Sequence, residues 1–327
     1  MKKYLYVFLI VIVGFLLIFM NKTENKNKKD NNTKVKVAEV THSIFYAPFY
    51  VSIENGYFKE NGIDIDLILT SGADKVSAAV LSGDVNIGLA GAESAIYIYQ
   101  GGEKDYLQIF SGLTKRDGQF ILGRKNDKDF KLSDLKGKEI LVGRKGGMPS
   151  LNFLNALDNE GINAKDIKIN YQIDFASLSG AFISGTGDYV NLFEPNATLL
   201  NKENKGYTLL SVGKYSGIMP YTTFYARKSY INNHTDLIKK YVNAINKGLD
   251  YVKNHESKEI AEVISSQFPD TSINDLTMMI QNYKDADSWL SDSKTSKESF
   301  DNLQSILIKN ELIDNKTPYN KLVRNFD

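Results

Sequence analysis

The sequence predicts an α/β protein built from two similar lobes. Its 327 residues are about twice the length of a typical single domain. Short alternating apolar runs are followed by helical patterns and then by further short apolar runs, which predicts strand–helix–strand units and mostly parallel sheets. A Ser-Gly turn followed by Asp, a short strand and a carboxylate occurs twice, at 81–93 and 183–194. Two similar lobes would produce such an internal repeat. The alternative is that common Ser-Gly-Asp turns recur by chance.

The composition is that of a folded protein with few groups for metal or thiol chemistry. Apolar residues make up 42% and charged residues 24%, which is ordinary for a globular chain. The 40 Lys and Arg balance 39 Asp and Glu, so no charge excess favours nucleic acid as a partner. The chain has no Cys and only three His, which excludes disulfides, thiolate nucleophiles and zinc sites that need sulfur. We expect no catalytic residues, no metal and no cofactor.

The amino-terminal residues predict a signal sequence or membrane anchor. Lys2 and Lys3 precede an apolar run of seventeen residues, 4–20, a pattern typical of a secretory signal at the lower limit for spanning a bilayer. No small residues precede Asn21 for a signal peptidase. We therefore expect 1–20 to remain as an uncleaved signal or anchor, with atypical cleavage as the alternative. The polar segment 21–34 then reads as a flexible tether.

The first strand–helix units are expected before residue 124. Strands are expected at 35–40, 63–69 and 85–89, and apolar runs at 106–113 and 120–123 flank the loop 114–118. Short helices are expected at 50–54 and 73–81, because Asn55-Gly56 and Gly83 supply helix stops.

The pattern restarts at Leu132. Strand 139–142 and helix 149–159 come first, strands follow at 167–172, 189–193, 208–212 and 222–226, and helices at 236–252, 257–266 and 297–309. This restart and the late return strand predict one lobe from 35–115 plus 223–327 and a second lobe from 119–221. Ligands are expected at the carboxyl ends of the strands.

Several motifs together resemble a known family. They are IFYAPFYVSIENGYF at 44–58, NGIDI at 61–65, LSGDVNIG at 81–88, DLKGK at 134–138, KGG at 145–147 and YARKSY at 225–230. In this order they resemble the SsuA/THI5-like (NMT1-like) solute-binding proteins of ABC importers for nitrate, taurine, sulfonates and thiamine precursors, over about 36–310.

The resemblance implies a type II periplasmic-binding-protein fold, in which two α/β lobes joined by a two-strand hinge close on a small molecule. It also implies an ABC permease and its ATPase subunits as partners, and an extracytoplasmic location on the outer face of the cell membrane, as in Gram-positive bacteria. Many relatives there carry a lipid on a Cys near the position of Met20, and this chain has no Cys. Attachment through 1–20 is therefore expected instead, for a protein that acts as a monomer.

Candidate ligand-binding residues of the first lobe follow its strand ends. They are His42, Ser43, Phe45, Tyr46, Ser71, Gly72, Gly91 and Glu93. Backbone N–H groups at helix starts there suit an anion. Phe45 and Tyr46 could stack on a planar ligand or pack beneath the next helix. His42 could donate to a ligand or be a structural histidine with a backbone partner.

The second lobe and the hinge supply the remaining candidates. Lys145, Gly146 and Gly147 lie in a strand-to-helix loop that could cradle an anion or be a plain turn, and the loop lacks the GxxxxGK[ST] order of a P-loop. Phe175 and Glu194 follow other strands, and Glu194 could bind an amine, cap a helix or form a salt bridge to the permease. Arg116 could reach a ligand or pair with Asp117.

Carboxylates and aromatic rings suit an aminopyrimidine, whereas glycine loops with Arg116 or Lys145 suit a sulfonate such as taurine. We favour a planar, nitrogen-bearing ligand, captured outside the cell and delivered to a permease. A membrane-tethered sensor is the first alternative. A pyrimidine-biosynthesis enzyme on this fold is the second, and the Cys-rich motif of such enzymes is absent. We expect one interlobe pocket to be lined by His42, Tyr46, Ser71, Glu93, Lys145, Gly147 and Glu194.

Overall fold

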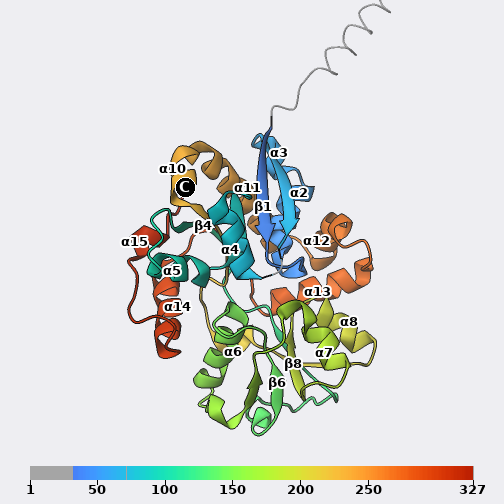
Figure 1. The fold of residues 1–327 in the computed structure, drawn as a ribbon. Helices are drawn as coiled ribbons and strands as arrows, with labels where there is room; N and C mark the ends of the chain where they lie inside the picture. The colour runs from blue at the N-terminus through green and yellow to red at the C-terminus, as the bar shows by residue number, and fades with distance from the viewer. Residues whose placement is uncertain (1–31, 71, 327) are drawn as a thin grey trace, which may run out of the picture. The chain divides into compact units, whose positions relative to one another are not determined.

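The computed structural model describes residues 32–70 and 72–326, which contain two five-stranded sheets. The first has the order β2-β1-β3-β10-β4 and the second the order β7-β6-β8-β5-β9 (Figure 1). The strands are β1 (Thr33–Glu39), β2 (Ile63–Leu69), β3 (Ile87–Gly91), β4 (Leu107–Thr114), β5 (Phe120–Gly123), β6 (Glu139–Leu141), β7 (Lys168–Asn170), β8 (Tyr189–Leu192), β9 (Tyr207–Ser211) and β10 (Thr222–Arg227).

The helices lie between and after these strands. The α-helices are α2 (Ala47–Glu54), α3 (Tyr57–Glu60), α4 (Ala73–Ser82), α5 (Glu93–Gln100), α6 (Met148–Asn159), α7 (Leu178–Ile183), α8 (Asn196–Lys202), α9 (Gly213–Ser216), α10 (Lys228–Asn233), α11 (Thr235–Asn254), α12 (Ser257–Ile264), α13 (Ile273–Asp285), α14 (Lys297–Lys309) and α15 (Tyr319–Leu322). The 3-10 turns are η1 (Ile44–Tyr46), η2 (Leu132–Leu135), η3 (Ala164–Asp166), η4 (Phe175–Ser177) and η5 (Ser265–Gln267).

The two sheets share one plan, which confirms the predicted α/β fold of two similar halves. β1 runs parallel to β3, and β6 runs parallel to both β7 and β8. Each sheet also holds one reversed strand: β10 is antiparallel to β3 and β4, and β5 is antiparallel to β8 and β9. These reversed strands are the ones that the chain enters when it passes from one sheet to the other. Below, the first lobe means the first sheet with α2–α5 and α10–α15, and the second lobe means the second sheet with α6–α9.

Two crossing segments, 115–119 and 217–221, connect the lobes. They lie side by side, because Met219 N–H donates to the Lys115 carbonyl oxygen (3.0 Å) and Tyr221 N–H donates to that of Thr114 (3.1 Å). Val212, the residue before α9, is also joined to the crossing 115–119, since its N–H donates to the carbonyl oxygen of Gln119 (2.9 Å). The predicted pair of hinge strands therefore corresponds to two hydrogen-bonded segments.

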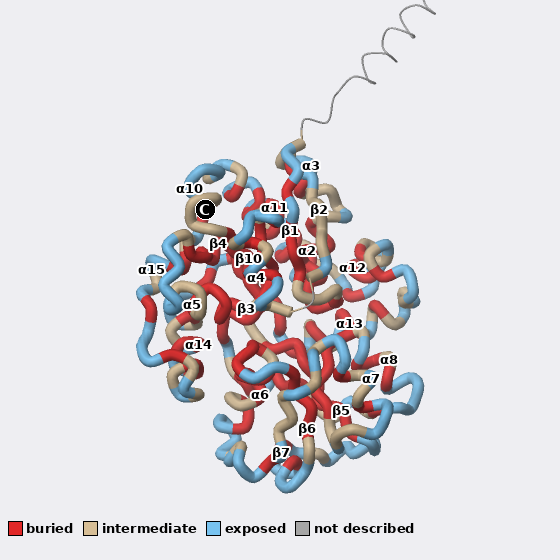
Figure 2. The backbone as a smooth tube through the Cα atoms, viewed as in Figure 1, coloured by how far each residue is buried: buried red, intermediate tan, exposed pale blue. Residues whose placement is uncertain are grey.

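The core of the first lobe depends on close helix packing. All residues of β4 are buried, and α11 buries Ile238, Val242, Ile245 and Leu249 along one face (Figure 2). This spacing of three and four residues places them on one side of a helix. A Cβ on Gly248 would lie 2.1 Å from the carbonyl oxygen of Pro48, so glycine lets α11 approach α2.

The amino-terminal predictions fall mostly outside the described residues. The anchor 1–20 and most of the tether 21–34 are not described, and β1 takes in the last two tether residues, Thr33 and Lys34. Among the helices at 32–70 and 72–326, none is both long and apolar enough to cross a membrane.

Candidate functional site

The carboxyl end of β3 meets the start of α6 from the other lobe. Glu93 is the first residue of α5, directly after β3 and Ala92, and it is 1% exposed. A Cβ on Gly91 would lie 2.5 Å from Cγ of Met148 and 1.9 Å from Oε2 of Glu93. Glycine at position 91 therefore lets the Glu93 carboxylate and the Met148 side chain come together over the strand end.

Glu93 is an unusual carboxyl group. Burial raises its pKa to about 7, against the opposing effects of the Arg144 charge and of backbone N–H groups at Glu93, Met148 and Ser94. Its Oε2 atom is buried and has no hydrogen-bond partner within the described part of the chain. A buried polar atom without a partner costs about 1–3 kcal/mol. A ligand N–H or O–H donor at this oxygen would remove that cost.

The charge of Glu93 acts on the hydroxyl groups of four tyrosines. Burial is the main cause that raises the pKa of each hydroxyl, and the charge of Glu93 raises it further in Tyr46, Tyr97, Tyr221 and Tyr225. Tyr46, Tyr221 and Tyr225 are buried, while Tyr97 is half-buried. A buried carboxyl group with a raised pKa therefore interacts electrostatically with these tyrosine hydroxyls.

The loop before α6 faces this site. The hydroxyl of Tyr97 donates to the carbonyl oxygen of Gly146 (2.8 Å), which links α5 of the first lobe to the second lobe. Ser150 Oγ donates to the carbonyl oxygens of Arg144 (2.9 Å) and Gly147 (3.0 Å), so this hydroxyl holds the loop. Gly147 is the N-cap residue of α6. Arg144 and Lys145 are both exposed, and the charge of Arg144 lowers the pKa of Glu93.

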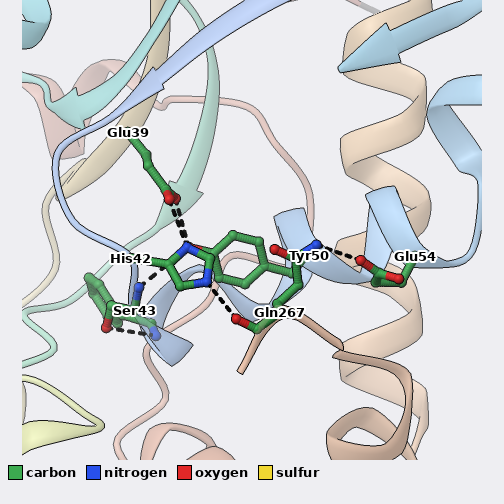
Figure 3. Close-up of polar contacts among 7 residues, drawn as sticks. Glu39, His42, Ser43, Tyr50, Glu54 and Gln267 are labelled. Atoms are coloured by element: carbon green, nitrogen blue, oxygen red, sulfur yellow. Dashed lines mark hydrogen bonds and ion pairs between the residues drawn. The ribbon is translucent and has the colours of Figure 1, made fainter. Parts of the chain in front are cut away.

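His42 belongs to a separate network within the first lobe (Figure 3). Its Nδ1 lies 2.7 Å from Oε1 of Glu39, and its Nε2 lies 2.9 Å from the carbonyl oxygen of Gln267. The Tyr50 hydroxyl donates to the other Glu39 oxygen (2.7 Å), and the Gln267 side chain donates to Glu54. Because the Glu39 carboxylate and the Gln267 carbonyl are both acceptors, the protonated imidazole can donate from both of its ring nitrogens. Burial lowers the pKa of His42, but the hydrogen bond and charge of Glu39 and the Gln267 carbonyl outweigh it, so the pKa is raised.

Glu194 caps a helix and joins the lobes. Its carboxylate accepts from the backbone N–H and the hydroxyl of Thr198 (both 2.9 Å), in the first turn of α8, and from the side-chain amide of Asn282 (2.9 Å). Its backbone N–H donates to the hydroxyl of Tyr283 (2.9 Å), and its carbonyl oxygen accepts from Ser43 Oγ (2.6 Å). The sequence left open whether Glu194 binds an amine, caps a helix or forms a salt bridge to the permease. In the structure its carboxylate caps the first turn of α8.

The two candidate phenylalanines pack against other rings. The ring centroid of Phe45 lies 5.3 Å from that of Phe193, 5.6 Å from Tyr221 and 5.1 Å from Tyr283. Phe175 is half-buried and meets Phe193 edge to face at 5.5 Å. Both therefore belong to an aromatic cluster that links the lobes.

The other candidates lie apart from Glu93 or outside the described residues. Arg116 Nε lies 3.5 Å from a carboxylate oxygen of Asp287, whereas Asp117 is fully buried. Gly72 is the N-cap residue of α4, and Ser71 is not described. Over 32–70 and 72–326, no three His, Asp or Glu side chains are grouped so that they could hold a metal ion.

The structure brings some of the predicted residues together and adds others. The predicted residues around the carboxyl group are Tyr46, Gly91, Glu93, Gly146 and Gly147. The residues that the sequence patterns did not indicate are Arg144, Met148, Tyr97, Tyr221 and Tyr225. One signal was available: Tyr97 follows Glu93 by four residues, the spacing that places two side chains on one helix face.

Comparison with known proteins agrees with this architecture. A family model described as "NMT1/THI5 like" matches residues 44–259. The chain is 42% identical over 297 residues to the "Putative binding protein YtlA" of Bacillus subtilis (strain 168), covering 90% of this chain and 89% of that protein.

Two solved structures show the same fold at low identity. The alkanesulfonate-binding protein SsuA from Xanthomonas axonopodis pv. citri, bound to MOPS, has a TM-score of 0.72 at 15% identity and covers 90% of this chain and 98% of its own. A Candida albicans protein described as having the generic periplasmic binding protein fold has a TM-score of 0.68 at 16% identity, covering 89% and 96%. The fold inferred from the sequence is thereby confirmed.

Proposed function

Because this chain belongs to the NMT1/THI5-like family, we propose that it is the extracytoplasmic substrate-binding component of an ABC importer. It captures a small molecule between its lobes at Glu93 and delivers it to a membrane permease. One observation carries the proposal: a buried carboxyl oxygen, to which no group in the described residues donates, lies where β3 of the first lobe meets α6 of the second. The proposed attachment to the outer face of the membrane is through residues 1–20.

The proposed capture of a ligand depends on contacts that form only when the two lobes lie against each other. The link from Tyr97 to Gly146 and the approach of Met148 to Gly91 exist only when the loop before α6 lies against the end of β3. A ligand that touches both sides therefore favours the closed state by its differential contacts. The hydrogen-bonded crossings 115–119 and 217–221 are the proposed hinge.

The chemistry around Glu93 favours a planar ligand that bears an N–H group. A protonated ring nitrogen or an exocyclic amine would donate to the unpartnered Oε2, and the tyrosine rings would cover the ring faces. This supports an aminopyrimidine-like compound. A sulfonate is the alternative, held by Arg144 and the backbone N–H groups at the start of α6.

A thermal-shift screen tests the proposal. The full chain is heated with taurine, alkanesulfonates, nitrate and aminopyrimidines, because a ligand that binds only the folded state raises Tm by mass action. The compound with the largest shift is then titrated calorimetrically into the wild type, Glu93→Ala and Glu160→Ala. Glu160 is exposed at the end of α6 and serves as the matched control.

We expect Glu93→Ala to weaken binding about tenfold to a hundredfold and Glu160→Ala to leave it unchanged. If no compound raises Tm, or if Glu93→Ala binds as tightly as the wild type, the proposed function of this site is wrong.

A further inference from the structure

A second cavity, separate from the Glu93 site, lies beside the hinge. Its volume is about 330 Å³, within the range of small-ligand pockets. Its walls come from the end of α11, the end of α13, the segment 287–291 and Lys115, the first residue of the crossing 115–119. It belongs to the first lobe and the hinge.

The floor of this cavity is apolar and fixed. Leu249 and Val252 of α11 are 1% and 2% exposed, and the ring of Trp289 is 8% exposed. The indole N–H of Trp289 donates to the carbonyl oxygen of Phe45 (2.8 Å), which holds the ring in place. A flat or short aliphatic group would find a preformed apolar surface here.

The rim carries an excess of positive charge. Lys115, Lys253 and Lys284 line the cavity with a single carboxylate, Asp287. Lys115 is paired with Asp287 (2.7 Å), which Arg116 also contacts, so that carboxylate is already shared by two cations. The Lys284 ammonium donates to the carbonyl oxygen of His255, and an ammonium has further N–H donors. Lys253 is exposed, and no carboxylate pairs with it in the described structure.

Ser288 connects the wall of this cavity to the hinge. This residue lines the cavity at 1% exposure, and its Oγ has no hydrogen-bond partner among the residues that the structure describes. Its backbone holds the hinge, since its carbonyl oxygen accepts from the N–H of Lys115 (2.9 Å). The Oγ atom is screened from solvent, so the polar groups that a ligand can reach in this cavity are those of the cationic rim.

We propose that this hinge-side cavity binds a small organic anion, namely a carboxylate or sulfonate attached to one ring or to a short alkyl chain. The apolar part lies against the Trp289 ring, and the acid group meets the ammonium groups of Lys253 and Lys284. Such a ligand also meets Lys115, where the crossing 115–119 begins.

Trp289 is the only tryptophan of the chain and lies in the cavity wall, so its fluorescence reports on this site. The probe is cyclohexanecarboxylate, which does not absorb at the excitation wavelength, and its neutral isostere cyclohexanecarboxamide is the chemical control. The variants are Lys253→Glu and the matched Lys240→Glu, an exposed lysine of the same helix outside the cavity. Glu93→Ala separates this site from the interlobe site.

We expect the carboxylate to change Trp289 fluorescence saturably in the wild type, Lys240→Glu and Glu93→Ala. Lys253→Glu should bind at least about tenfold more weakly, since an attraction is replaced by a repulsion, and the carboxamide should have no effect. The proposal is overturned by the absence of a saturable change, by an equal response to the carboxamide, or by an unchanged affinity in Lys253→Glu. Loss of the response in Glu93→Ala would place the probe in the interlobe site and also overturn it.

Discussion

The hydroxyl of Ser43 donates a 2.6 Å hydrogen bond to the main-chain carbonyl oxygen of Glu194, 151 residues away in the sequence. Ser43 follows β1 of the first sheet, and Glu194 follows β8 of the second. The carboxyl ends of β1 and β8, one strand from each lobe, therefore lie close enough for the following residues to contact each other directly. The cap that Glu194 provides for α8 and its bond to Asn282 fix one side of this contact.

Removing this hydroxyl should loosen the closed protein. Ser43→Ala leaves the buried Glu194 carbonyl without its donor, so the free energy of unfolding should fall by about 1–3 kcal/mol. Urea unfolding of the full chain measures it, with Ser184→Ala as the control, because Ser184 is exposed and bonds only within its own turn. Equal losses in both variants would mean that the link between the lobes contributes nothing.

The charge of His42 should make stability depend on pH. The folded state raises the pKa of His42 above 6.5, so the imidazolium contributes stability that is fully present below about pH 6.5. That contribution is lost as the pH rises through the folded pKa. The difference in unfolding free energy between the wild type and His42→Gln should therefore shrink with increasing pH. An NMR titration midpoint for the His42 ring below 6.5 would contradict the ion pair with Glu39.

Ionisation of the buried Glu93 carboxyl group should destabilise the folded protein. Its folded pKa of about 7 exceeds its ordinary value of 4.5, so the folded state loses stability as the pH rises between these values. Glu93→Gln should be more stable than the wild type by on the order of 1–3 kcal/mol above about pH 7, and this gain should vanish below about pH 4.5. Urea unfolding at several pH values tests it against Glu160→Gln. A gain in stability that does not change with pH would show that the folded state does not raise the pKa of Glu93.

The contact between α11 and α2 should not accept a methyl group. In Gly248→Ala the new Cβ would lie 2.1 Å from both the Pro48 carbonyl oxygen and Ser52 Oγ, and overpacking of this kind costs about 1–3 kcal/mol. Gly180→Ala in α7 is the matched control, since nothing lies within 4 Å of its Cβ position and alanine favours a helix. Tm should fall in the first variant and stay level or rise in the second.

Local patterns in the sequence located most strands and the long helices α6, α11 and α14, but no helix was named at Ile273–Asp285, where α13 lies. The helix predicted at 297–309 is α14 with the same bounds, and those predicted at 73–81 and 149–159 differ from α4 and α6 by one residue at one end. The sequence analysis named no helix at 93–100, where α5 lies, because Ile and Tyr alternate there as they would in a strand.

The site was harder to predict, because its partners are distant along the chain. The strand ends pointed to Gly91, Glu93 and Gly146 as candidates; in the structure Gly91 lies against Glu93 and Met148, and the Gly146 carbonyl oxygen accepts from Tyr97. His42 is engaged by Gln267, which is 225 residues away, and no local pattern reveals that contact. The importance of Arg144 over its neighbour Lys145 likewise depends on how the loop before α6 faces Glu93.

The central claim is that a ligand closes the two lobes on each other through Glu93. The chain has no Cys, so spin labels can be placed at Lys239→Cys on α11 and Lys165→Cys in η3, which are exposed residues of the first and second lobes. The distance between the labels is measured by pulsed electron paramagnetic resonance, with and without the best compound from the thermal-shift screen. We predict that the compound shifts the distances to one short, narrow distribution, and that Glu93→Ala abolishes this shift at the same concentration. An unchanged distribution at saturating ligand, or the same shift in Glu93→Ala, would contradict the account.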